Sequence, residues 1–172
     1  MTYQLLLLSA TALALAGCAG IRPDASVTAE LRPTQGSTVT GKVLFVQHLP
    51  HMVRVSGQVS GLPPYSEHGF HIHEFGDCSS PDASSAGGHF NPNNAPHGQH
   101  AQGQQHAGDL PSLRTNASGM AVVQYDSTQI SITDSTHSIA GRALIVHAKP
   151  DDFTSQPTGN AGARLACAVI AR

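Results

Sequence analysis

Basic clusters are missing from this sequence of 172 residues: no segment is rich in Lys or Arg, and charged residues make up only 12% of the chain. The formal net charge is −2 at pH 7. A nucleic-acid-binding domain typically presents a basic patch or stripe, so this composition argues against a nucleic-acid partner. A convincing helical period of apolar residues is also missing beyond the N-terminal segment, which argues against a helical domain.

Hydrophobic runs long enough to cross a bilayer are absent, and the apolar run within residues 1–17 falls short of one. This segment therefore predicts a signal peptide. The motif L-A-G-C at residues 15–18 resembles a bacterial lipobox, in which the cysteine, here Cys18, is acylated and becomes the mature N-terminus. We expect residues 18–25 to form a lipidated N-terminus and tether, and residues 26–172 to form one domain. An ordinary secretory signal that happens to contain a cysteine is the alternative, and both interpretations predict export.

Cysteines are few, with three in the chain. If Cys18 carries lipid, Cys78 and Cys167 remain, and an exported pair most simply forms one disulfide. Such a bridge would close a loop of about 90 residues, which corresponds to roughly 4–5 kcal/mol of stabilisation in the chain-entropy model. Two buried free thiols are the alternative.

Short strand signals take the place of helices: apolar and polar residues alternate, β-branched residues recur, and Gly or Pro separates the segments. The expected strands are residues 27–31, 37–46, 52–59, 69–75, 112–115, 120–126, 130–133, 142–148 and 164–170. Residues 116–119 (N-A-S-G) predict a hairpin turn, which we favour over the glycosylation sequon that they also match. Many short strands with such turns predict an all-β sandwich or barrel.

Two long connections interrupt this pattern, residues 76–108 and 150–163. Loops of this length in a compact domain are usually functional or disordered. Because the first contains a histidine cluster and Cys78, we expect a metal and a disulfide to order it.

Histidine is abundant, with eleven in the chain. Two histidines form an H-x-H motif on an expected strand, where alternate side chains share a face. Three more and an aspartate follow with the spacing H-x7-H-x8-H-x2-D, and another ends a strand. Neutral imidazoles suit zinc and copper, and one carboxylate completes a tetrahedral zinc set, so this pattern predicts a metal centre rather than scattered surface histidines. The candidate ligands are His71, His73, His89, His97, His106, Asp109 and His147.

Five blocks of this sequence resemble the copper–zinc superoxide dismutase family and occur in its order. They are GFHIHEFGDC at 69–78, GGHFNP at 87–92, AGDL at 107–110, GRALIVH at 141–147 and GNAGARLAC at 159–167. The resemblance covers essentially all of the chain after the tether. The position of Cys78 directly after Gly-Asp is similar to the bacterial exported branch of the family. The resemblance implies an eight-stranded Greek-key barrel or sandwich with two long functional loops.

The resemblance also implies one copper and one zinc ion per subunit. The implied copper ligands are His71, His73, His89 and His147. The implied zinc ligands are His89, His97, His106 and Asp109, so that His89 bridges both ions as an imidazolate. Asp151 would link ligand imidazoles of the two sites, with capping of a turn as the alternative. Arg164 would guide the anionic substrate, with a surface ion pair as the alternative.

The remaining histidines have no implied role. We expect them to be surface or structural residues, with His100, inside the zinc loop, as the most credible spare ligand. They are His48, His51, His68, His100 and His137.

The implied reaction is the dismutation of superoxide to oxygen and hydrogen peroxide. Copper would take an electron from one superoxide and return it to the next, whereas zinc has no redox chemistry and would serve structure. His89, which would leave copper and take a proton on reduction, and Arg164 are the expected catalytic residues. A charged funnel of this kind can raise the on-rate of an anion by about 10–10³.

An exported enzyme of this kind would protect the cell envelope from extracytoplasmic superoxide. We expect a lipid-anchored protein of the outer membrane that faces the periplasm, with a soluble periplasmic protein as the alternative. The sequence leaves monomer and homodimer open. Two other function classes remain: a non-catalytic copper carrier built on the same barrel, and an adhesive β-sandwich that needs no metal.

Overall fold

The computed structural model describes residues 25–50 and 52–171 of the chain. The expected signal peptide, the lipobox with Cys18, and the tether up to residue 24 lie outside the described residues. Within the described part, no helix is long and apolar enough to cross a membrane. The elements are β1 (Ser26–Pro33), β2 (Thr40–Leu49), β3 (Met52–Ser60), β4 (Glu67–His68), β5 (Phe70–His73), a 3-10 turn η1 (Ser84–Ala86), β6 (Leu113–Arg114), β7 (Ala121–Ser127), β8 (Ala143–His147) and β9 (Arg164–Ala171).

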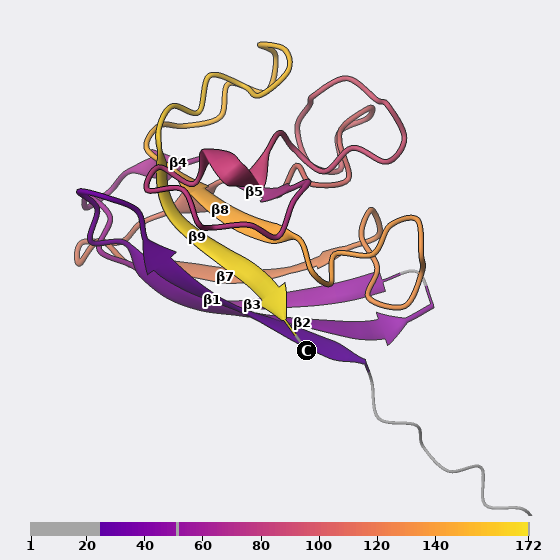
Figure 1. Cartoon of the computed structure of the whole chain (residues 1–172). Coiled ribbons are helices and arrows are strands. Elements are labelled where there is room, and N and C mark those ends of the chain that lie inside the picture. Colours follow the sequence, from indigo (N-terminus) through magenta and orange to yellow (C-terminus); the bar gives the residue numbers. More distant parts are fainter. Residues whose placement is uncertain (1–24, 51, 172) are drawn as a thin grey trace, which may run out of the picture.

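One curled antiparallel sheet dominates the molecule (Figure 1). Its strand order is β5-β8-β9-β1-β2-β3-β7, so the first strand pairs with the last and β3 pairs with β7. β4 and β6 form a separate two-stranded sheet. Pairing between strands that are not consecutive in the chain is typical of Greek-key folds. The expected all-β Greek-key architecture is confirmed.

Alternation along the strands builds the core. In β2, Val43 and Phe45 are fully buried while Lys42 and Leu44, which point the other way, are exposed. β8 is buried along its whole length because side chains on both of its faces are covered. Full burial of a large apolar side chain stabilises a fold by about 1.5–3 kcal/mol, so these strands form a rigid framework, and β8 carries the candidate ligand His147 at its end.

One expected strand, residues 130–133, is wrong. Ile130 and Ile132 are buried, but the backbone here makes only an isolated bridge. The side-chain oxygen of Gln47 accepts hydrogen bonds from Ser131 Oγ at 3.1 Å and from the Ile132 N–H at 2.9 Å. An amide side chain therefore takes the place that a strand partner would have, and the apolar pattern reflects burial alone. The other expected strands are present with shifted ends; β5, for example, is shorter than residues 69–75.

The two long connections lie together above the sheet, before β6 and before β9 (Figure 1). A disulfide between Cys78 and Cys167, with Cα atoms 5.9 Å apart, ties the first connection to β9. The expected disulfide is therefore confirmed. It closes a separation of 89 residues, which makes it a strong constraint on the unfolded chain.

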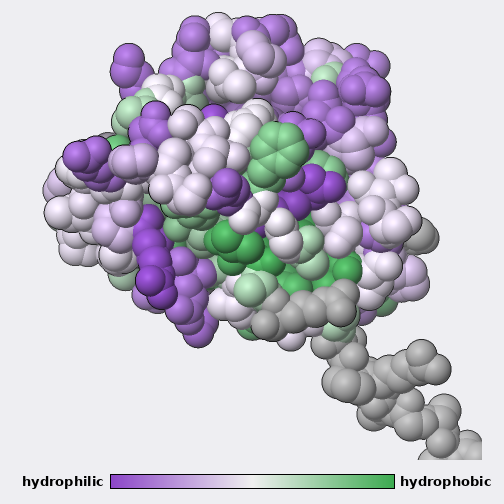
Figure 2. Space-filling view, in the orientation of Figure 1, coloured by the Kyte–Doolittle hydropathy of each residue, from purple (hydrophilic) through white to green (hydrophobic). Residues whose placement is uncertain are grey.

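The face shown in Figure 2 is mostly hydrophilic or neutral, with one hydrophobic area over β9. Val169 on β9 is 41% exposed. The candidate ligand histidines contribute nothing to this area because all of them are buried.

Candidate metal centre

Two neighbouring strands carry three of the candidate ligands. His71 and His73 alternate on β5, and His147 ends β8, the strand with which β5 pairs. Their side chains turn into the structure, with residue exposures of 0%, 1% and 5%. The period of two along a strand thus aims both H-x-H imidazoles to one side, as the sequence predicts.

The first long loop brings the other ligands back to β5. Isolated antiparallel bridges join His73 to His89 and His71 to Asp109. The backbone N–H of Phe90 donates to the Ile72 carbonyl at 2.8 Å, and the Ile72 N–H donates to the Gly108 carbonyl at 2.9 Å. The loop is therefore hydrogen-bonded to β5 at its middle and at its C-terminal end.

All seven predicted ligands come together in two groups that share one residue. Within each group the candidate ligand atoms lie within 4.8 Å of one another. The first group has four imidazoles: His71, His73, His89 and His147. The second has three imidazoles and a carboxylate: His89, His97, His106 and Asp109.

In the four-imidazole group, hydrogen bonds hold the ring nitrogens that face outward. His71 Nε2 donates to Asp151 Oδ2 at 2.7 Å, His73 Nδ1 to the Gly87 carbonyl at 2.9 Å, and His147 Nδ1 to the Gly162 carbonyl at 3.1 Å. The inner nitrogens lack such partners: His71 Nδ1 and His89 Nε2 are buried without a hydrogen bond. The His73 and His147 Nε2 atoms face each other at 3.3 Å. Buried polar atoms without partners are rare, and four inward-facing imidazole nitrogens suit copper.

In the second group, three Nδ1 atoms converge on one carboxylate oxygen. Asp109 Oδ1 lies 2.8 Å from His89 Nδ1, 3.0 Å from His97 Nδ1 and 3.4 Å from His106 Nδ1. The other oxygen, Oδ2, accepts hydrogen bonds from the backbone N–H groups of Gly98 and His106, which hold the carboxylate in place. Three imidazoles and one carboxylate are a donor set that tetrahedral zinc accepts.

At four of the candidate ligands the electrostatics favour the protonation states that bind metal. Burial, together with neighbouring histidines, lowers the pKa of His89 to about 4 and of His147 to about 3, and lowers the pKa of His73 well below its usual range. Burial would raise the pKa of Asp109, but hydrogen bonds from His106, His89 and His97 outweigh it and hold that pKa far below the usual range. Neutral imidazoles and an ionised carboxylate are the forms that coordinate metals.

Asp151 joins the two groups through one carboxylate. Its Oδ2 accepts from His71 Nε2 at 2.7 Å and its Oδ1 from His97 Nε2 at 2.9 Å. Burial lowers the pKa of His97, but its hydrogen bonds to Asp109 and Asp151 outweigh burial and raise that pKa to about 9. The surroundings of His97 Nδ1 therefore favour a positive charge, which a metal cation would supply in place of a proton.

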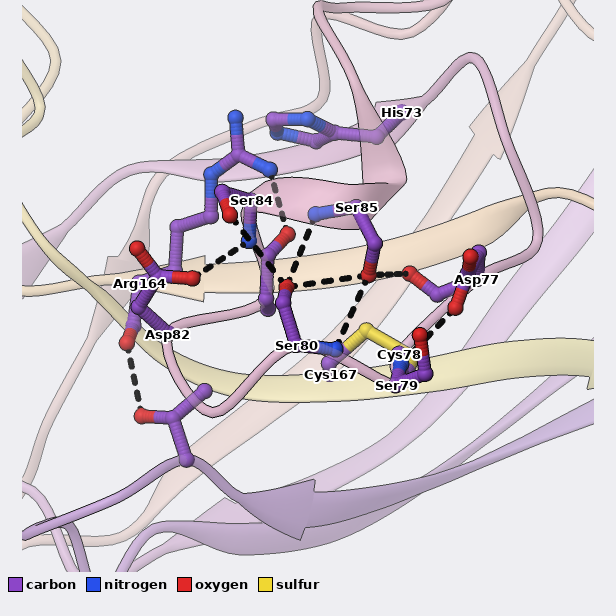
Figure 3. The surroundings of a disulfide bond; sticks show 12 residues. His73, Asp77, Cys78, Ser79, Ser80, Asp82, Ser84, Ser85, Arg164 and Cys167 are labelled. Carbon is purple, nitrogen blue, oxygen red and sulfur yellow. Dashed lines mark hydrogen bonds between the residues drawn. A yellow bond between two sulfur atoms is a disulfide. The ribbon is translucent and has the colours of Figure 1, made fainter.

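Arg164, the first residue of β9, is tied to the disulfide-bonded loop (Figure 3). Its Nη1 donates to the Ala83 carbonyl and its Nη2 to the Gly87 carbonyl, each at 2.6 Å. The Gly87 carbonyl thus receives both Arg164 and His73. Gly87 has φ +73°, and a Cβ there would lie 2.7 Å from the Phe75 ring, so this position requires glycine.

An open depression of about 610 Å³ reaches the four-imidazole group at His147. Lys149, Asn160 and Gly162 also line it. A larger depression of about 820 Å³ lies along β1 and β9 and includes none of the candidate ligands. The smaller depression therefore opens onto the metal centre at His147, and a third one, of about 380 Å³, opens onto it at His89.

His68 has a structural position, which is one of the two expectations for the spare histidines, but its partners were not predicted. It is buried, its Nδ1 donates to the His147 carbonyl at 2.8 Å, and its Nε2 lies 2.8 Å from Ser66 Oγ. No sequence spacing signals this contact, because it joins residues 79 positions apart. His68 is outside both metal groups.

The other spare histidines that the structure describes also lie outside the two metal groups. His100 donates from Nδ1 to the Asp109 carbonyl at 2.9 Å, and its ring packs edge-on near Tyr125. His48 is exposed and His137 is partly exposed, while His51 lies outside the described residues.

Comparison with known proteins agrees with this geometry. The family model of copper/zinc superoxide dismutase (SODC) matches residues 39–170. Superoxide dismutase [Cu-Zn] 2 of Aquifex aeolicus is 37% identical over 156 residues, covering 88% of this chain and 90% of that protein. Superoxide dismutase [Cu-Zn] 3 of Arabidopsis thaliana is 41% identical, covering 78% of this chain and 84% of that protein.

Structural comparison points the same way. The crystal structure of the clock protein EA4 superposes with a TM-score of 0.78 at 37% sequence identity, covering 88% of this chain and 97% of that one. The sheet, the two donor groups and the sequence matches agree with one another. The chain belongs to the copper/zinc superoxide dismutase family, and it is an oxidoreductase that uses copper and zinc.

Proposed function

We propose that His71, His73, His89 and His147 hold the copper of this superoxide dismutase, and that His89, His97, His106 and Asp109 hold its zinc. The observation that carries the assignment is the division between outer and inner donor atoms. Hydrogen bonds fix the outer atoms, and the inner atoms of each group converge. Each donor set also fits the metal assigned to it.

Bound copper supplies one-electron redox chemistry, so that two superoxide anions react in turn rather than with each other. His89 belongs to both groups, with Nε2 toward the other three imidazoles of the copper group and Nδ1 toward Asp109. A proton held at His89 Nε2 can pass to the reduced product, and Asp109 keeps the ring oriented from the Nδ1 side.

Arg164 guides the anion. Its side chain is half-buried and held by two backbone carbonyls, and it makes no ion pair with a carboxylate within 4 Å among the described residues. Burial lowers its pKa somewhat while the charge of Asp82 raises it, and a guanidinium stays charged at any physiological pH. A fixed cation near the copper group favours a small anion over a neutral molecule.

Metal analysis together with a superoxide-decay assay tests the assignment. The loaded enzyme is expected to contain copper and zinc in equal amounts and to consume superoxide. Chelation should remove the activity, and restoring both metals should return it. Copper loading without consumption of superoxide would contradict the proposal and favour a copper carrier.

We further propose that the enzyme is exported, lipidated at Cys18 and held at the outer membrane facing the periplasm. There it would protect the cell envelope from extracytoplasmic superoxide. The L-A-G-C motif at residues 15–18 supports this proposal, as does the disulfide, which suits an oxidising compartment. A soluble periplasmic enzyme is the alternative, and it would lack the acyl group.

A further inference from the structure

Gln156 lies in the second long loop, 59 positions from His97 in the first. The stretch around His97 has no regular secondary structure, so no neighbouring strand satisfies its backbone. The amide of Gln156 takes that role. The His97 N–H donates to Gln156 Oε1 at 2.8 Å, and Gln156 Nε2 donates to the His97 carbonyl at 3.0 Å.

The same loop holds His97 a second time, through its ring. Asp151 Oδ1 accepts from His97 Nε2 at 2.9 Å. Gly159 lies against this contact, because a Cβ on it would come within 2.6 Å of His97 Nε2. The second long loop therefore contacts the backbone of His97 through Gln156, and it contacts the ring at Nε2 through Asp151 and Gly159. His97 is only 3% exposed.

We propose that Gln156 is a positioning residue for zinc: it fixes the backbone of His97 so that Nδ1 stays aimed at the second donor group. This inference rests on the proposed zinc assignment of His97. The Asp151 contact holds the ring, and the Gly98 N–H bond to Asp109 Oδ2 holds the residue that follows, whereas Gln156 holds the N–H and the carbonyl of His97 itself. Partners behind a metal ligand commonly change metal affinity by 10–100-fold when they are removed.

Coupling between sites is reciprocal. If Gln156 holds His97 in place for zinc, then zinc bound at His97 holds the loop of Gln156 in place. That loop, residues 150–163, also supplies Thr158 and Asn160 to the depression that opens onto His147. Zinc would thereby order one wall of the approach to the copper group.

Two variants of the full metal-loaded enzyme test the contact. Gln156→Met keeps the length of the side chain and removes both hydrogen bonds, and Gln156→Ala removes the side chain. Gln102→Ala is the matched control, because Gln102 is an exposed glutamine of the first loop. Zinc release into an excess of chromogenic chelator is expected to be roughly ten-fold faster in both Gln156 variants. The rate of copper release from both Gln156 variants, and the rate of zinc release from the Gln102→Ala control, should stay near the wild-type values.

Hydrogen exchange of peptides from residues 150–163, with and without zinc, gives a second readout. In wild type, zinc should slow exchange in this loop, and in Gln156→Met most of that zinc-dependent slowing should be lost. A purely structural role would lower thermal stability but leave the zinc-release rate unchanged, and that result would overturn the inference. If Gln156→Met released zinc at the wild-type rate, the inference would be overturned and the metal assignment would stand. If the wild-type enzyme held no zinc at this site, both the inference and the metal assignment would be overturned.

Discussion

Each strand-borne candidate ligand histidine divides its two ring nitrogens between different tasks. His73 shows the division: Nδ1 donates to a loop carbonyl and Nε2 faces the other imidazoles. The outer hydrogen bond selects the tautomer and holds the ring in place, which increases the basicity of the inner nitrogen. The consequences of changing a single ligand therefore depend on the group to which it belongs.

Replacing a ligand in each group should separate copper from zinc. Asp109→Ala removes the oxygen on which three Nδ1 atoms converge, so zinc affinity and thermal stability should fall, with activity lost more gradually. His73→Ala should abolish activity while the fold survives. Metal content by elemental analysis and thermal melting of both variants check this, and equal copper loss in both would contradict the assignment.

Charge reversal at Arg164 tests anion guidance. Arg164→Glu turns attraction into repulsion, which salt screens over about 8–10 Å at physiological ionic strength. The superoxide rate should fall strongly at low salt, with copper and zinc content unchanged. The wild-type rate should decrease as salt rises, and the variant's rate should decrease less or increase. Full activity of the variant at low salt would leave Arg164 with a structural role only.

At the scale of elements, the first long loop is attached to two different strands. The disulfide ties it to β9, and hydrogen bonds tie it to β5. This loop also supplies the Ala83 and Gly87 carbonyls that hold Arg164. The disulfide therefore supports the geometry of the anion site as well as stability.

Loss of the disulfide should affect both properties. The double variant Cys78→Ser, Cys167→Ser is expected to lose about 2–5 kcal/mol of unfolding free energy. Its activity should fall, because the carbonyls that hold Arg164 become mobile. Urea unfolding and the superoxide assay measure the two effects. Thiol counting on unfolded, unreduced mature wild type should find no free thiol, and two free thiols would contradict the bridge.

At the scale of the whole molecule, burying several neutral histidines together makes the metal-free protein sensitive to acid. The pKa values of His89 and His147 are about 4 and about 3 in the fold, below the usual 6.5. The unfolded chain takes up these protons first, so this part of the stability is complete above pH 6.5 and is lost as pH falls toward 4 and 3. His97, with a pKa of about 9, acts in the opposite direction: its contribution is complete below pH 6.5 and is lost as pH rises through 9.

The metal-free protein should therefore be most stable near pH 6.5 and should lose stability more steeply on the acid side, where His73, His89 and His147 act together. Urea unfolding of the chelated protein from pH 4 to pH 9 measures this profile. The metal-loaded enzyme is the control, and its stability should hold until protons displace the metals from the ligands. A flat profile between pH 6.5 and pH 4 would show that these histidines are not buried as neutral groups.

Attachment of the molecule to a membrane is tested at Cys18. Wild type expressed in a bacterium should incorporate labelled fatty acid and sediment with membranes. Cys18→Ser should lose both the label and the membrane association, because no acceptor for the acyl group remains. A wild-type protein that is soluble and unacylated would favour the ordinary secretory signal.

The sequence by itself determined the fold class and the ligand types, and it favoured the pairing of the cysteines over two free thiols. These depend on short patterns: a period of two aims His71 and His73 to one side, and Cys78 and Cys167 are the two cysteines within residues 26–172. The tertiary structure alone decided which ring nitrogen of each histidine faces inward. It also decided that the Gly87 carbonyl accepts hydrogen bonds from both His73 and Arg164, and that Gln156 bonds the N–H and the carbonyl of His97. It also replaced the expected strand at residues 130–133 with a segment that Gln47 holds. These contacts join residues 14 to 85 positions apart, and most of them arise where separate strands and loops pack together, so no local pattern in the chain specifies them.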